Sequence, residues 1–170
     1  KTQFISEAAG LSSVLKNLPA NSSVSVPSGQ PGAVVFTASP VGGLAVFNVS
    51  AAQVFSGLTQ QIDLVLNGAQ NVVINVTGAS ANWTTGNMTG AWQSLQVRSH
   101  LIWNFHEATT LSFNNQWNGA LLAPGATLQN FTEMNGSVFV GAMNQSGEVH
   151  LPLYQGYVPG PGAAGLIALG

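Results

Sequence analysis

The sequence has no cysteine and very little charge. The absence of cysteine excludes disulfides, thiolate catalysis and cysteine-ligated zinc. Only 5% of the 170 residues are charged, three of them basic and five acidic. Three basic side chains cannot neutralise a row of phosphates or hold an anionic membrane surface, so we expect no nucleic-acid partner and no binding to a lipid headgroup layer. A chain of this length should form one domain with a substantial core.

Reactive side chains are sparse as well. His100, His106 and Glu107 form the only cluster of titratable groups with chemical promise. On an expected strand, His106 and Glu107 should point to opposite faces, and His100 would lie about 20 Å from His106, too far to share a metal ion. Asp63 lies inside an apolar run and should face away from its apolar neighbours, either solvated or bonded to a nearby turn.

Catalytic sequence motifs are also missing. No Gly-x-Ser-x-Gly, P-loop or His-Glu-x-x-His pattern occurs, and no second acid near Asp63 completes a glycosidase pair. We therefore predict no enzyme activity, no bound metal and no cofactor. The chain starts without a signal peptide, and we expect residue 1 to follow a processing site.

Asparagine is abundant where charge is not. Eight of the fifteen asparagines begin an Asn-x-Ser/Thr triplet, against roughly two or three expected by chance. The excess predicts a secreted glycoprotein whose glycans replace the missing surface charge, although the turns of a polar β protein also use Asn, Ser and Thr heavily. The candidate glycosylation sites are Asn21, Asn48, Asn75, Asn82, Asn87, Asn130, Asn135 and Asn144.

Periodicity predicts one helix followed by many short strands. Residues 6–18 place apolar side chains at helical spacing between Ser6, an expected N-cap, and Pro19. From about residue 33 to 153, short β-rich runs, including "NVVINVT" and "SLQV", alternate with Gly, Asn, Pro and Ser. Alternation in "NVVINVT" places Asn75 on the outer face.

Residues 110–125 are repeated, with substitutions, by residues 127–142. The shift is seventeen residues, and it superimposes Thr110 on Thr127 and Asn118 on Asn135. A unit of this length fits two or three short strands joined by corners, so stacked copies would form a β-solenoid with the helix packed alongside. A β-sandwich with similar hairpins is the alternative fold. In the solenoid, Asn104, Asn118 and Asn135 would form internal ladders of side-chain amides that hydrogen-bond from one rung to the next.

Two tryptophans are candidates for stacking against a ligand. Trp83 and Trp92 lie in the polar stretch "SANWTTGNMTGAWQ", which we expect to be an exposed loop. Aromatic faces suit sugar rings, so this loop is the predicted carbohydrate contact. Trp103 and Trp117 occupy strand positions and are expected in the core.

Three stretches together resemble the choice-of-anchor A domain. They are "VVINVTG" (72–78), "LIWNFHEATTLSF" (101–113) and "GALLAPGATLQN…NGSVFVGAM" (119–143), within a resemblance that covers about residues 6–155. The resemblance implies a β-rich extracellular domain used for attachment, adhesion or matrix building, with no catalytic residues to transfer. The layout is also similar to that of β-solenoid ice-binding proteins, in which a helix packs along a stack of rungs. The residues that fit the family pattern are Trp103, Asn104, Phe105, Ala108, Leu122, Ala123, Pro124 and Ala126.

The C-terminal segment 158–170 is set apart from the domain at 1–157. Its sequence "VPGPGAAGLIALG" resembles the start of a PEP-CTERM sorting tail, but it has Gly160 in place of the usual Glu and no basic cluster. Its apolar run is too short to span a bilayer, so contact with a membrane would require a processed C-terminal anchor. The alternative is docking onto another subunit through Val158, Pro159, Pro161, Leu166, Ile167 and Leu169.

These observations predict a non-enzymatic structural or adhesive protein at the cell surface or outside the cell. We expect it to self-associate into filaments or a matrix through solenoid edges and its tail, or to contact surface glycans. The alternatives are an ice-binding β-solenoid, which requires a flat face of Thr or other small residues, and a carbohydrate-binding or carbohydrate-active domain.

Overall fold

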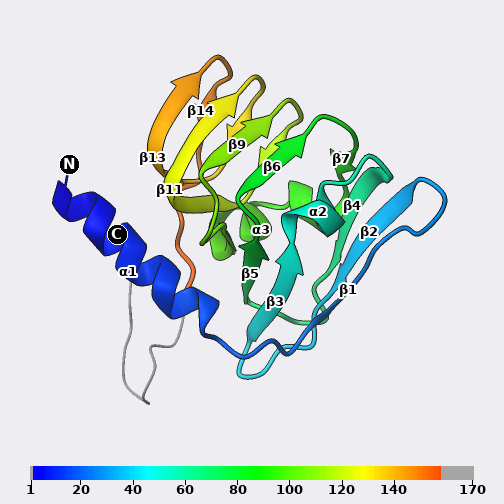
Figure 1. Cartoon of the computed structure of the whole chain (residues 1–170). Helices are drawn as coiled ribbons and strands as arrows, with labels where there is room; N and C mark the ends of the chain where they lie inside the picture. Colours follow the sequence, from blue (N-terminus) through cyan, green and yellow to red (C-terminus); the bar gives the residue numbers. More distant parts are fainter. Residues whose placement is uncertain (1, 158–170) are drawn as a thin grey trace.

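The computed structural model describes residues 2–157 and shows a mostly β fold with one long helix along its side (Figure 1). The elements are α1 (Thr2–Lys16), β1 (Ser23–Ser25), β2 (Gly32–Thr37), β3 (Leu44–Ser50), α2 (Ala51–Val54), β4 (Thr59–Val65), β5 (Asn71–Thr77), β6 (Ser80–Trp83), β7 (Asn87–Met88), the 3-10 helix η1 (Gly90–Gln93), α3 (Leu95–His100), β8 (Leu101–Asn104), β9 (Thr110–Phe113), β10 (Trp117–Asn118), β11 (Ala120–Asn130), β12 (Met134–Asn135), β13 (Val138–Gln145) and β14 (Val149–His150).

The largest sheet is parallel and curls into a half-barrel. Its strand order is β3-β5-β8-β11-β9-β6, and β13 also pairs with β11. β11 bends: its first half pairs with β8 and its second half with β9, which carries the sheet around a corner. Two smaller sheets, β1-β2-β4-β7 and β10-β12-β14, complete the walls. Figure 1 shows β6, β9, β11 and β13 side by side at one end of this curl.

The seventeen-residue repeat is confirmed as a stacking register. Leu121 pairs with Val138, Thr127 with Thr110, and Trp117 with Met134, and all three pairs are parallel. Each copy therefore lies directly on the next, as the repeat predicts. Earlier turns pair at longer separations: Ser80 of β6 lies beside Thr110 of β9.

One aromatic cluster fills the space enclosed by the strands. The indoles of Trp92 and Trp103 stack with their centroids 5.3 Å apart, and the rings of Phe113 and Trp117 stack at 4.4 Å. Large rings suit this space because each covers several stacked strands at once. The cluster members are Phe36, Phe47, Phe55, Trp83, Trp92, Trp103, Phe105, Phe113 and Trp117.

The helix covers the outer face of the β3-β5-β8-β11-β13 strands. Leu15 is fully buried there with Val73 and Ile102, and Leu11 and Leu18 pack against them. These are the apolar positions that the periodicity selects. The predicted start is wrong: α1 begins at Thr2, so Ser6 lies inside the helix and is not its N-cap.

The strand predicted for "SLQV" is also wrong. Residues 95–100 form α3, and the hydroxyl of Ser94 accepts a hydrogen bond from the backbone N–H of Val97 at 3.2 Å. Ser94 is therefore an N-cap, a signal that competes with a four-residue β pattern. None of the helices within residues 2–157 is long and apolar enough to cross a membrane.

Candidate functional site

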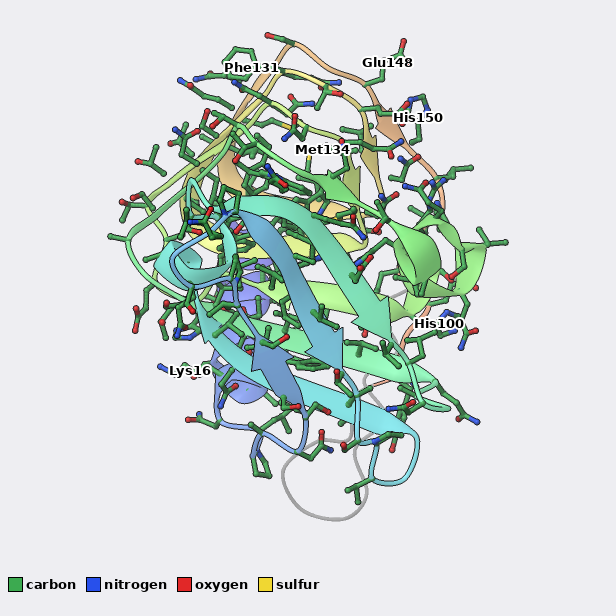
Figure 2. The ribbon with its side chains drawn as sticks, turned by 90° about the vertical axis from the view of Figure 1, so that its right-hand side faces the viewer. Lys16, His100, Phe131, Met134, Glu148 and His150 are labelled. Carbon is green, nitrogen blue, oxygen red and sulfur yellow. The ribbon has the colours of Figure 1, made fainter. Side chains whose placement is uncertain are left out.

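The titratable cluster of the sequence does not assemble into a reactive site. His100 ends α3, while His106 follows β8 in a turn, so the two histidines do not share a strand. Figure 2 shows His100 on the opposite side of the view from Lys16. Within the described part of the chain, no three His, Asp or Glu side chains gather in a way that could hold a metal ion.

His106 lies beside a shallow hollow under the helix. The hollow has a volume of about 410 Å³ and is lined by Ser12, Lys16, His106 and Pro124, among others. Burial lowers the pKa of His106; nearby Glu107 raises it in part and Lys16 lowers it further. His106 Nδ1 is 3.9 Å from Glu107, whose other oxygen accepts the Gly78 N–H at 2.9 Å. Glu107 therefore fixes a turn.

Asp63 has a structural role too. It accepts hydrogen bonds from the Gln61 side chain at 2.7 Å and from the Thr89 hydroxyl. Thr89 directly follows β7, the strand that pairs with β4. Asp63 therefore links adjacent strands, in agreement with the prediction that it bonds to a neighbouring turn.

The prediction of an exposed tryptophan platform is wrong. Trp83 is 1% exposed on β6, and Trp92 is 0% exposed in η1. The polar stretch around them misleads because alternation along β6 turns Trp83 inward while Ser80 and Asn82 face outward. Neither indole is accessible to a ligand.

Replacing Trp92 with alanine should destabilise the fold. Trp92 packs against Phe36 and Trp103, so its loss leaves a large cavity and should lower the free energy of unfolding by about 4 kcal/mol. Chemical denaturation measures the change. Leu95→Ala, at a 70% exposed position on α3, is the control and should change stability by less than about 0.5 kcal/mol. A variant of full stability would show that Trp92 is outside the core.

A ladder of asparagines fastens α1 to the sheet. Asn75 donates to Asn48 at 3.1 Å and to the Leu15 carbonyl at 2.9 Å. Asn104 donates to Asn75 at 2.9 Å and to the Ser12 carbonyl at 3.0 Å, and it accepts the Ser12 hydroxyl at 2.6 Å. The sheet thus supplies second partners for the carbonyls of Ser12 and Leu15; the Leu15 carbonyl also accepts the Leu18 N–H at 3.1 Å.

The predicted ladder is only partly correct. Asn104 belongs to one, but the other members are Asn75, to which it donates, and Asn48, which accepts from Asn75. Asn118 and Asn135 pair in register and are buried, yet both amide atoms of Asn118 lack a partner among the described residues. Register alone therefore does not align the amides for hydrogen bonding.

The asparagine triplets separate into buried and exposed sites. Asn75 points away from the aromatic core as predicted, but α1 covers it, so its expected exposure is wrong. Asn130 and Asn135 are buried as well, so the folded chain has no room for a glycan at these three positions. Asn21 is half-buried. Its side-chain amide donates to the Leu44 carbonyl and accepts the Val46 N–H, so both of its polar atoms bond the backbone of β3. Exposed triplet asparagines are Asn48, Asn82, Asn87 and Asn144, and glycosylation there stays a prediction.

The most regular surface is the outer face of β6, β9, β11 and β13. The residues that face outward on these strands are in register, so short side chains line up in two columns across the sheet. The first column is Ser80, Thr110, Thr127 and Ala142, and the second is Asn82, Ser112, Gln129 and Asn144.

This face, here called the polar face, carries no charge. Its eight residues are exposed apart from half-buried Ser112. Strands repeat at about 4.8 Å, and alternate residues along a strand at about 6.8 Å, so the side chains form a regular grid. Such a grid cannot do acid–base or nucleophilic chemistry. It can bind another ordered surface by shape and many weak hydrogen bonds.

The polar face belongs to a class of regular, uncharged sheet surfaces whose shape suits contact with another surface. Comparison with protein families agrees with this class: residues 2–151 match the model described as "Putative Ice-binding-like adhesive domain". The chain belongs to this family of adhesive domains. The family indicates an extracellular or surface location.

The other comparisons add no relative. Neither the curated proteins nor the solved structures give a match to this chain. The family match supports the surface and adhesive part of the sequence prediction. The finer resemblance to the choice-of-anchor A domain is not confirmed and stays a prediction.

Proposed function

We propose that this chain is a non-enzymatic extracellular adhesive module built as a β-solenoid, which attaches to its target through the polar face. The observation that carries the proposal is the register of the two columns across four parallel strands. Stacking at fixed register gives a flat face on a rigid support, and the aromatic core behind it prevents the face from deforming. Adhesion by this face needs neither a metal nor a cofactor.

Self-association into filaments or a matrix is the second part of this proposal. β11 is paired on both sides, whereas β13, among residues 2–157, pairs with β11 only. An eight-residue strand with a free edge and no charged residue is suited to pairing with another chain. The stack would therefore grow through its edge while the polar face stays available to the target.

Ice binding is the alternative that the geometry favours next. Thr110 and Thr127 are adjacent in the first column, flanked by Ser80 and Ala142, so one line of the face has only small side chains. The second column contains the triplet asparagines Asn82 and Asn144, where glycans would obstruct contact with ice and equally with any other target of the polar face. A carbohydrate-stacking function loses its main support, because Trp83 and Trp92 are buried.

The test places bulk and charge on the polar face. Thr110→Arg with Thr127→Arg should reduce retention of the chain on its target surface at least tenfold, because long side chains break the flat grid. Retention is measured on a glycan array and on polycrystalline ice, with thermal hysteresis as a second readout for ice. Ser28→Arg with Gln60→Arg, at exposed positions away from this face, is the matched control. Equal losses in the two variants would contradict the assignment of the face, and so would retention on neither surface.

A further inference from the structure

The two ends of the strand stack differ in how they are closed. At the β3 end, the N–H groups of Asn21 and Ser22 both donate to the Val46 carbonyl, at 3.1 and 3.2 Å, and β1 covers the edge of β2. At the β13 end, the outer strand edge has no partner within residues 2–157. The first end is therefore capped, and the second is open.

An apolar groove lies at the open end. It has a volume of about 470 Å³, and its walls include Val138, Met143, Val149, Leu151 and Leu153. Leu151 is 76% exposed and Leu153 64% exposed, which is costly for leucines that stand side by side. Figure 2 shows Glu148 and His150 at the same end as Phe131, far from Lys16. The groove floor has no charged residue, and His150 with Glu148, 3.1 Å apart, borders it.

The chain leaves the open end and runs toward the capped one. After β14, the Tyr154 N–H donates to Ser137 at 2.9 Å, the Gln155 N–H donates to the Ser99 carbonyl at 2.7 Å, and the Tyr157 N–H donates to Asn71 at 2.8 Å. Ser137 directly precedes β13, Ser99 lies in the last turn of α3, and Asn71 is the first residue of β5. The segment therefore crosses the stack and reaches Asn71, one strand short of β3.

We propose that residues 158–170 of one copy bind in the open-end groove and along the β13 edge of a second copy, joining copies head to tail. Residue 158 follows Tyr157, which lies near the capped end. A second copy stacked against that end with its open end first would place its groove next to this point. Thirteen residues span at most about 45 Å, enough to cross several strand spacings of about 4.8 Å. Reaching the groove of its own copy would require the chain to reverse and climb the stack again.

The chemistry of the segment matches the groove. Residues 158–170 have no charge and end in Leu-Ile-Ala-Leu before the last glycine. Apolar side chains would enter the groove between Leu151 and Val138, and backbone groups would pair with β13. At the capped end the β3 edge is occupied at the Val46 carbonyl and β1 is only three residues long, so direct stacking of a neighbour's β13 there would pair few residues. This inference rests on the self-association part of the proposed function and names the element that mediates it.

The test follows self-association of the full chain by sedimentation velocity. We expect concentration-dependent oligomers that an excess of synthetic peptide 158–170 converts to monomers. Leu151→Glu with Leu153→Glu should weaken association at least tenfold. The matched control is Val65→Glu with Leu95→Glu, at positions 44% and 70% exposed on β4 and α3, and it should associate like the unaltered chain. Circular dichroism checks that both variants fold.

The outcomes separate this inference from the broader proposal. Association that ignores both the peptide and the groove variant would overturn the docking of residues 158–170 and leave self-association intact. A full chain that is monomeric at every concentration would overturn the docking and self-association together. Adhesion through the polar face is measured independently, since Thr110 and Thr127 lie outside the groove.

Discussion

Replacing Asn104 with alanine is expected to lower the free energy of unfolding by about 4 kcal/mol. Asn104 is fully buried and makes three side-chain hydrogen bonds, two to Ser12 and one to Asn75. Its loss leaves the Ser12 hydroxyl and the Asn75 oxygen without a partner, and each such buried group costs about 1–3 kcal/mol. Urea denaturation measures the change as a lower midpoint at unchanged slope.

The matched control for Asn104 is the exposed end of the same ladder. Asn48 accepts one hydrogen bond from Asn75, and Asn75 keeps its bond to Leu15 when Asn48 is removed. Asn48→Ala should therefore cost less than about 1 kcal/mol. Hydrogen exchange gives a second readout, because loss of the clamp should lower the protection of α1 more than that of β5. Equal costs for the two variants would show that the ladder does not fasten the helix.

Replacing Gly136 with alanine is expected to destabilise the fold by more than about 3 kcal/mol. Gly136 has a φ of +143°, and an added Cβ would lie 2.5 Å from the Gly119 carbonyl oxygen and 2.6 Å from its carbon. These are backbone atoms of the turn below, so they cannot rotate away, and both the clash and the strained φ oppose the side chain. The corner must open or the register of β12 on β10 must shift.

Gly10 is the control for the same chemical change. It lies exposed inside α1, and an added Cβ would meet nothing within 4 Å. Gly10→Ala should raise stability by up to about 1 kcal/mol, because alanine favours the helix. Thermal and urea unfolding of both variants measure the change in stability, which should be positive for Gly10→Ala and negative for Gly136→Ala. A stable Gly136→Ala variant would mean that the copies do not approach each other at this corner.

The Asn-Gly corners explain why a repeat was visible in the sequence. Gly119 and Gly136 occupy equivalent corners, with one directly above the other, so close stacking demands glycine at both. Trp117 and Met134 precede them in register and point into the core. Identical backbone geometry and equivalent burial therefore preserve the spacing of seventeen residues between these two turns, whereas the following turn pairs Met134 with Val149 at a spacing of fifteen.

Earlier turns of the stack have the same strand pairing, but it is not visible as a repeat in the sequence. Thr110 lies thirty residues from Ser80, its partner in the first column, because η1 and α3 are inserted between β7 and β8. A repeat search at fixed spacing finds Thr127 above Thr110 but misses Ser80. The half of the polar face on β9 and β11 was thus predictable from periodicity. The residues on β6 depended on the insertion, and those on β13 depended on a register shift after Ala123 that shortens the spacing to fifteen residues.

Local sequence patterns determined most of the secondary-structure elements, whereas contacts between distant segments determined which side chains are exposed to solvent. From the sequence alone come the helix, the short strands and the stacked repeat, since these depend on periodicity and turn residues. Only the tertiary structure decided that α1 covers Asn75, that Trp83 and Trp92 lie inside, and that one end of the stack stays open. Alternation assigns a residue to a face of a strand. Whether a helix, another strand or solvent covers that face depends on segments distant in the chain.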